Sequence, residues 1–74
     1  MDLMTAQEGK EHIIDRVQTG DTALENFLFT LGCYAGEPIT VIARRWGSCT
    51  VAIKDGRYNM DTRLAKAITV TALD

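Results

Sequence analysis

The stretch that decides the fold is Leu31-Gly32-Cys33-Tyr34-Ala35-Gly36-Glu37-Pro38-Ile39. The strongest helical pattern of the chain ends where this stretch begins, and the strongest strand pattern starts where it finishes. Gly32 suits a helix end, because glycine readily adopts the left-handed backbone conformation that closes many helices. Gly36 and Pro38 then predict a short turn before an alternating apolar run that opens at Ile39. We therefore expect a helix and a sheet that pack on each other.

The helix is predicted over about Thr22 to Leu31. Thr22 and Glu25 match a capping box, in which the two side chains satisfy free backbone amides at the helix start. Phe29 lies about 200° around the helix from Phe27, so it is either an exposed docking residue or covered by a groove that holds the helix. The apolar residues at helical spacing form one stripe, which we expect to face the core: Ala23, Leu24, Phe27, Leu28 and Leu31.

A three-stranded meander is predicted after the helix, with alternating apolar residues from Ile39 to Ala43 and from Cys49 to Ile53. Trp46-Gly47-Ser48 is the turn between the first two strands. Asp55-Gly56 predicts a type I′ hairpin turn before the third strand, at Arg57 to Met60, because that turn needs positive φ at both central positions.

The two ends of the chain add further elements. Lys10 to Val17 has the pattern of an irregular strand, in which a β-bulge would place Ile14 and Val17 on one face. Asp61 or Thr62 can cap a helical turn near 62–66, and a last strand follows at 68–70. Five short strands favour a closed barrel over an open sheet, because closure removes exposed edges. The prediction is one mainly-β domain over residues 1–74.

Composition limits the function classes. The formal net charge of −2 argues against a dedicated nucleic-acid binder, and it gives no reason to expect an anionic membrane surface as the main target. The first residues lack the basic and apolar regions of a signal peptide, and the longest apolar cluster is far below the ~20 residues of a membrane span. We expect a cytoplasmic protein without direct membrane insertion; the oligomeric state stays open.

Taken together, these residues resemble the FeoA family of bacterial ferrous iron uptake. The similarity extends from about Met4 to Val70 and rests on the order and spacing of the following elements: Gly9, Leu28-x-x-Leu31-Gly32, Gly36-x-x-Ile39-x-Val41, Val51-x-Ile53 with Gly56, and Met60-Asp61-x-x-Leu64-Ala65-x-x-Ile68-x-Val70. Two features differ from many members: the Trp46-Gly47-Ser48 loop is short, and Asn26, Phe27 and Phe29 stand where basic residues are common.

The resemblance implies a small SH3-like β-barrel with an inserted helix. It also implies a partner, the FeoB-type membrane GTPase permease, which carries the transport and the nucleotide chemistry. The same domain is similar to the C-terminal module of iron-dependent transcriptional repressors. A shared fold does not fix a function, so the FeoA family and the repressor module each suggest a different role for this chain.

Catalytic chemistry finds no support in the sequence. No G-x-x-x-x-G-K-[ST] run is present to bind nucleotide phosphates. His12 is the only histidine and Ser48 the only serine, and no acid is positioned in the sequence to orient a catalytic pair. We expect no enzyme activity.

Candidate metal ligands are His12, Cys33 and Cys49, since imidazole and thiolate suit zinc or ferrous iron. No two of them have the spacing of a local chelating motif, and each cysteine has an alternative place in the core as a small hydrophobe. No other cofactor is expected.

Candidate partner-binding residues are Phe29, Tyr34, Arg44, Arg45 and Trp46. Arginine and tryptophan are enriched at interface hot spots, and a tryptophan at a two-strand turn is difficult to bury. The alternative is that the Trp46 ring folds over the barrel mouth while the arginines are solvated.

The sequence therefore favours a non-enzymatic module that binds and modulates a FeoB-type permease. The alternative is a transition-metal-binding or metalloregulatory module related to the repressors' C-terminal domain. In that role, Tyr34, Trp46 and Tyr58 would form the walls of a groove for a proline-rich segment.

Overall fold

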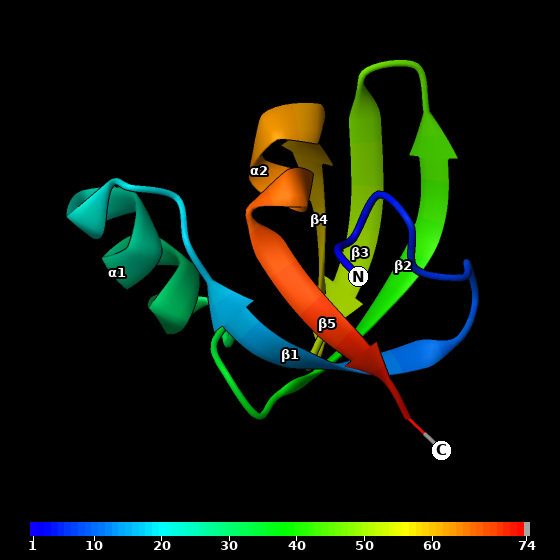
Figure 1. Ribbon diagram of the computed structural model, residues 1–74, viewed down its shortest axis with the longest axis horizontal. Coiled ribbons are helices and arrows are strands. Elements are labelled where there is room, and N and C mark those ends of the chain that lie inside the picture. Colours follow the sequence, from blue (N-terminus) through cyan, green and yellow to red (C-terminus); the bar gives the residue numbers. More distant parts are fainter. Residues whose placement is uncertain (74) are drawn as a thin grey trace.

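The computed structural model describes residues 1–73 and shows a mainly-β, SH3-like fold (Figure 1). The described part contains one five-stranded antiparallel sheet of order β4-β3-β2-β1-β5 and two helices. The predicted fold class is confirmed, including the inserted helix and the short helix near 62–66. The elements along the chain are β1 (Glu11–Val17), α1 (Thr22–Thr30), β2 (Pro38–Arg45), β3 (Ser48–Ile53), β4 (Gly56–Asp61), α2 (Thr62–Lys66) and β5 (Ile68–Ala72).

The prediction of a closed barrel was wrong, since within residues 1–73 no ladder joins β4 to β5 and the sheet stays open between these strands. Helix α2 connects these two strands, and its Ala65 is fully buried. The N-terminal segment runs along β5, where Val70 N–H donates to the Met1 carbonyl at 2.7 Å and Asp2 bridges Thr69. A helical turn and a terminal segment therefore occupy the places where a closed barrel would have a continuous ladder.

The core lies between the curved sheet, α2 and the N-terminal segment. Leu3 and Ala6 of that segment are buried, although the sequence pattern did not mark them as core residues. Ile39, Val41, Cys49, Val51 and Ile53 face inward, as predicted. The alternation fails at Ala43, because the β2–β3 register shifts after Val41 and places Arg44, not Ala43, opposite the buried Cys49. The buried apolar residues are Leu3, Ala6, Ile14, Leu28, Cys33, Ile39, Val41, Cys49, Val51, Ile53, Met60, Ala65, Ile68 and Val70.

Strand β1 contains the predicted irregularity. Its pairing with β5 shifts register between Ile14 and Arg16. Ile14 is buried and Val17 packs against the core, so the predicted bulge and its effect on these two residues are confirmed. His12 points to the same buried side as Ile14, and its Nδ1 lies 2.9 Å from the Lys10 carbonyl.

The N-cap of helix α1 lies one residue before the predicted capping box. The N-cap is Asp21, whose carboxylate accepts a hydrogen bond from Leu24 N–H at 3.1 Å. The prediction of Thr22 as the cap was wrong, because an ionised carboxylate is the stronger acceptor at the positive end of a helix. Glu25 accepts hydrogen bonds from the backbone and hydroxyl of Thr19 instead of reaching back to Thr22.

Helix α1 ends as the sequence predicts. Leu31 is the C-cap, and Gly32 adopts a left-handed conformation with φ of 94°. Gly32 N–H donates to the Phe29 carbonyl at 3.0 Å, and Cys33 N–H donates to the Leu28 carbonyl at 2.9 Å. These two bonds form a Schellman motif, which fixes the direction in which the chain leaves the helix.

The apolar stripe of α1 is only partly buried, which corrects the prediction. Leu28 is buried, while Leu24 and Leu31 are half-buried. Ala23 and Phe27 are exposed, and 58% of Phe27 is accessible to solvent. Helix α1 stands at the side of the sheet (Figure 1), so it contacts the body with a narrow edge, and part of the stripe that was predicted to face the core stays exposed.

The β3–β4 turn also differs from the prediction. Ile53 pairs with Gly56, so the two loop residues are Lys54 and Asp55. Lys54 has φ of 52°, and no positive φ occurs at Asp55 or Gly56, both within the described chain. The prediction of a type I′ turn at Asp55-Gly56 was therefore wrong. A β-carbon at Gly56 would lie within 3 Å of the Tyr58 ring, so a larger residue there would require the ring to move.

Candidate partner-binding surfaces

An apolar groove of about 320 Å³ lies between α1 and β4. It exists because α1 touches the body mainly through Leu28, which leaves the neighbouring helix face open. The strand on the other side, β4, is an edge strand. We call this hollow the α1 groove, and its lining residues are Leu24, Phe27, Leu28, Leu31, Ile53, Arg57, Tyr58, Asn59, Met60 and Leu64.

A more polar hollow of about 520 Å³ continues the α1 groove toward α2. The two hollows share Leu24, Asn59, Met60 and Leu64, so together they follow the free edge of β4. Polar atoms at the α2 end come from residues that include Thr19, Asp21, Asp61 and Arg63. An extended peptide could pair with this strand edge while placing apolar side chains in the α1 groove.

Two of the predicted partner-binding residues lie together beside α1. The rings of Phe29 and Tyr34 stack with centroids 4.5 Å apart, and 59% of Phe29 is exposed. The Lys54 ammonium lies 5.8 Å from the Tyr34 ring centroid and pairs with the Glu37 carboxylate. The hydrogen bond to Glu37 raises the pKa of Lys54. Exposed Phe29 of α1 and half-buried Tyr34 of the following loop therefore form an aromatic pair that is flanked by the Lys54 cation.

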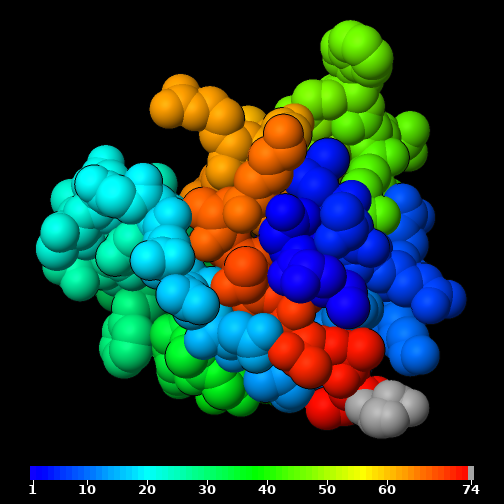
Figure 2. Space-filling model, viewed as in Figure 1, coloured from blue at the N-terminus to red at the C-terminus, as the bar shows by residue number. Residues whose placement is uncertain are grey.

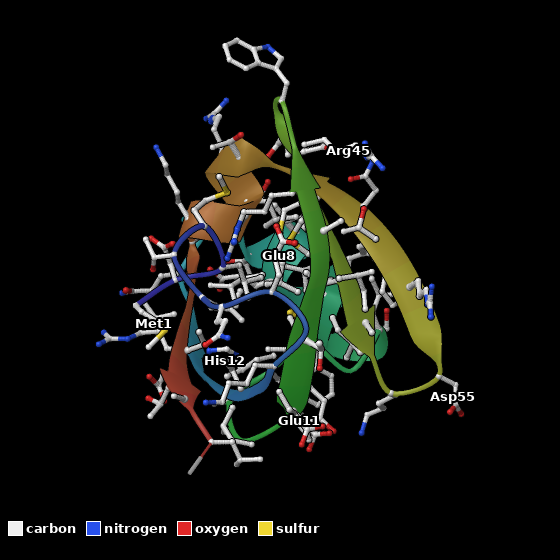
Figure 3. The ribbon with its side chains drawn as sticks, turned by 90° about the vertical axis from the view of Figure 1, so that its right-hand side faces the viewer. Met1, Glu8, Glu11, His12, Arg45 and Asp55 are labelled. Atoms are coloured by element: carbon white, nitrogen blue, oxygen red, sulfur yellow. The ribbon has the colours of Figure 1, made fainter. Side chains whose placement is uncertain are left out.

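Arg44 lies elsewhere and binds within the chain. Its guanidinium donates to the carbonyls of Leu3, at 3.0 Å, and of Ala6. It also lies 3.8 Å from the Glu8 carboxylate, which in turn accepts a hydrogen bond from Arg44 N–H at 3.2 Å. Figure 3 shows Glu8 against the strand that carries these contacts. Arg44 thus holds the N-terminal segment on the sheet.

Arg45 and Trp46 form a third location, at the turn between β2 and β3. Arg45 pairs with Ser48, so Trp46 and Gly47 make a two-residue loop. The side chain of Trp46 is fully exposed, with a relative accessibility of 102%. The alternative that its ring folds over the barrel mouth is therefore wrong. The five predicted residues occupy three separate places, and Tyr34, Trp46 and Tyr58 do not form one aromatic wall.

The three candidate metal ligands are all buried. Burial raises the pKa of the Cys33 thiol to about 11. Burial also raises the pKa of Cys49, with opposite and smaller effects from Arg44 and Glu8. Within residues 1–73 no three histidine, cysteine, aspartate or glutamate side chains cluster in a way that could hold a metal ion. Metal binding by His12, Cys33 or Cys49 stays a prediction.

Sequence patterns did not identify the lining of the α1 groove. Phe27 was assigned to the core because it belongs to the apolar stripe of the helix, and periodicity cannot tell how far a helix stands from its sheet. Tyr58 was considered only as a wall for a proline-rich segment. Neither α1 nor α2, the helices of the described region, is long and apolar enough to cross a membrane.

Comparisons with known proteins agree with this architecture. The model of the FeoA domain matches residues 1–72. No curated protein matches the chain. Among solved structures, a protein described as an iron uptake regulatory protein (FeoA) is similar with a TM-score of 0.79 at 19% identity, covering 96% of this chain and 93% of that one.

Two structures of manganese-dependent transcriptional repressors are also similar. One has a TM-score of 0.86 at 24% identity and covers 99% of this chain and 41% of the repressor. The other, a complex with manganese, has a TM-score of 0.84 at 25% identity and covers 99% and 36%. This chain thus spans about two fifths of the length of these repressors. On the match over residues 1–72, the chain belongs to the FeoA domain family.

Proposed function

We propose that this chain is a non-enzymatic, cytoplasmic accessory protein of ferrous iron transport that binds and modulates a FeoB-type GTPase permease. Membership of the FeoA domain family supports the link to iron. The observation that carries the binding role is the α1 groove with its exposed aromatic rim. An enzyme role has no geometric support, because the single histidine is buried with its Nδ1 beside the Lys10 carbonyl.

The α1 groove has the properties of a docking site for a protein segment. Phe27 lines the groove and is more than half exposed, while Phe29 is exposed on another side of the same short helix, stacked on Tyr34. Exposed apolar surface that borders a hollow is typical of interaction sites. The groove is concave and mostly apolar, and the free edge of β4 supplies backbone hydrogen-bonding groups beside it. The proposed partner segment is extended, with apolar side chains at alternate positions.

The test is a pull-down of the cytoplasmic domain of a FeoB-type permease by this protein, without nucleotide, with GDP and with a GTP analogue. We expect retention in at least one nucleotide state. The double variant Phe27→Ala/Phe29→Ala should weaken retention at least about tenfold, as expected when two interface aromatics are truncated. Trp46→Ala is the matched control and should retain the partner. Absence of retention in every state contradicts the proposal.

A second candidate function is metalloregulation, favoured by the similarity of 99% of the chain to a repressor complex with manganese at 25% identity. In this role the domain would bind ferrous iron or another divalent transition metal. Raised thiol pKa values oppose it, because a cysteine ligand must lose its proton before it binds metal. Titration with ferrous, manganese or zinc ion, followed by NMR, tests it. Tight binding with shifts confined to His12, Cys33 or Cys49 supports this role.

A further inference from the structure

The β2–β3 hairpin carries the most exposed large side chain of the described residues. The hairpin extends past the rest of the sheet at the top of Figure 1, and Figure 2 shows its turn as a convex projection. Trp46 occupies this turn between Arg45 and Gly47, and its whole side chain is in contact with solvent. Gly47 has φ of 73°, which a glycine adopts without strain. A bulky aromatic ring is thus held at the apex of a rigid two-stranded ribbon.

Helix α2 places two more basic residues at the same end. Arg45 pairs with Ser48 across β2 and β3, and Ser48 pairs with Asp61 across β3 and β4. Two strand spacings put Asp61 about 10 Å from Arg45. Asp61 is the N-cap of α2, which follows at once and carries exposed Arg63 and Lys66. We call Arg45, Trp46, Arg63 and Lys66 the tip surface.

The charges of the tip surface are not neutralised within the chain. Among residues 1–73 the ion pairs are Arg44–Glu8 and Lys54–Glu37, so none involves Arg45, Arg63 or Lys66. Carboxylates also lie nearby: Asp61 and Asp21 accept backbone hydrogen bonds as helix caps, and Glu8 pairs with Arg44. The tip surface thus carries three basic side chains without an ion-pair partner among the described residues, although the chain as a whole has a net charge of −2.

Acidic and basic residues are mixed at the opposite end of the molecule, where Lys10 precedes Glu11, and Lys54 and Arg57 stand near Asp55. Figure 3 shows Arg45 near one end and Glu11 and Asp55 at the other. Glu37 and Glu11 line the same small hollow at that far end, where Lys54 is already paired. The tip surface differs from this end because its basic side chains stand beside a fully exposed, projecting aromatic ring.

We propose that the tip surface binds the headgroup region of an anionic phospholipid bilayer. Tryptophan is favoured at the membrane–water interface because its ring is apolar while its N–H still finds polar partners. Arginine and lysine beside it are attracted to anionic lipid headgroups. This site is distinct from the α1 groove and does not depend on the proposed permease partner.

The shape of the tip favours a lipid surface over a protein partner. A stable protein interface buries about 800 Å² on each side, and its hot-spot residues sit in pockets sealed by surrounding contacts. The tip is a narrow projection with one aromatic residue, so it offers neither that area nor a surrounding rim. A headgroup layer needs no complementary shape, since it deforms around an inserted ring.

The experiment uses the intrinsic fluorescence of Trp46, which is the only tryptophan of the chain. The probe is vesicles made of equal parts phosphatidylcholine and phosphatidylglycerol at low ionic strength. We expect a blue shift of the emission, quenching by brominated lipid and co-sedimentation with these vesicles. Vesicles of phosphatidylcholine alone, soluble glycerol phosphate and high salt should each leave the emission unshifted.

Variants separate the tip surface from general electrostatics. Arg45→Glu/Arg63→Glu should weaken vesicle binding more than about tenfold, because each basic residue near the membrane surface raises the affinity about fivefold. Trp46→Ala should abolish stable co-sedimentation. Arg57→Glu is the matched control for charge, since Arg57 is exposed on β4 near the opposite end, and Phe29→Ala is the control for an exposed aromatic. Circular dichroism verifies that each variant is folded.

Three results would overturn the proposal. The first is an unshifted Trp46 emission with anionic vesicles at low ionic strength. The second is a loss of binding in Arg57→Glu equal to that in the tip variant, which would mean that total charge alone decides. The third is a blue shift caused by the permease domain without lipid, which would assign the tip to a protein interface. The first two outcomes leave the pull-down through the α1 groove unaffected, whereas the third would rule out Trp46→Ala as its control.

Discussion

Helices α1 and α2 begin with the same chemistry. Each has an aspartate N-cap, and the carboxylate accepts a hydrogen bond from the backbone N–H three residues later, at 3.1 Å for Asp21 and 2.8 Å for Asp61. Their packing differs. Helix α2 has five residues, and its Ala65 is fully buried between β4 and β5. Helix α1 has nine residues, all within the described part of the chain, and Leu28 is the single buried one among them.

This difference teaches that length and capping do not decide which helix belongs to the core. The shorter helix is part of the body because it spans the open side of the sheet, where the Leu3 N–H donates to its Ala65 carbonyl at 3.3 Å. The longer helix is attached at its ends and along one edge, so its free face forms the α1 groove. Local sequence is sufficient to form both helices, but their positions in the fold give them different structural roles.

The largest expected effect concerns the body around α2. Leu3→Ala removes a fully buried side chain from the segment hydrogen-bonded to α2. It should lower the free energy of unfolding by about 2–5 kcal/mol, through lost burial and the cavity left behind. Urea denaturation measures it. Phe27→Ala on α1 is the control and should change stability by less than about 0.5 kcal/mol. Equal losses would mean that α1 is packed as firmly as α2.

An intermediate effect concerns the residue that anchors the end of α1. Burial raises the pKa of Cys33 from 9.0 in the unfolded chain to about 11. Below pH 9 both states keep the proton, so stability does not depend on this group. Between pH 9 and pH 11 the unfolded chain loses the proton while the folded chain retains it, so stability should fall by roughly 2 kcal/mol as pH rises.

Urea denaturation across this pH range, for the natural chain and for Cys33→Ala, measures the contribution of Cys33. The difference between the two should grow above pH 9, and Cys49→Ala serves as the comparison for the other buried thiol, whose pKa is also raised. An identical alkaline slope in the natural chain and Cys33→Ala would show that Cys33 does not hold α1 through a buried, protonated thiol.

The smallest expected effect tests the two caps directly. Asp21→Ala and Asp61→Ala each remove one capping bond worth about 1 kcal/mol. Native-state hydrogen exchange should separate them: Asp21→Ala should speed exchange in α1 and leave the sheet unchanged, whereas Asp61→Ala should speed exchange in β4 and β5 as well. Asn at either position is the control, since it keeps a capping oxygen. Global acceleration by Asp21→Ala would contradict the independence of α1.

Sequence reasoning predicted most of the fold because its strongest patterns are local. Alternation placed the inner residues of β3, β5 and the first half of β2, up to the register shift after Val41, and Gly32 marked the end of α1. Asp61 was one of two predicted caps for the short helix. The errors came where several local solutions were available, as at the Lys54-Asp55 loop and at the choice between Asp21 and Thr22.

The candidate sites were harder to predict, because they depend on which surfaces remain uncovered. The partner-binding set grouped Arg44 with Arg45, since neighbours in sequence look alike, but the fold turns the Arg44 guanidinium toward Leu3 and Ala6 and leaves Arg45 exposed. Leu3 had no periodic neighbours to mark it as a core residue. Its burial results from contacts with residues more than forty positions away.

By itself, the sequence determined the helix, the strands and the stop at Gly32, because these follow from the backbone preferences of nearby residues. Only the tertiary structure decided that the sheet stays open under α2, that α1 leaves a groove beside β4, and that Trp46 stands at a basic end. These features depend on contacts between residues that are distant in the chain. Packing and strand register set these contacts, and no local sequence pattern encodes them.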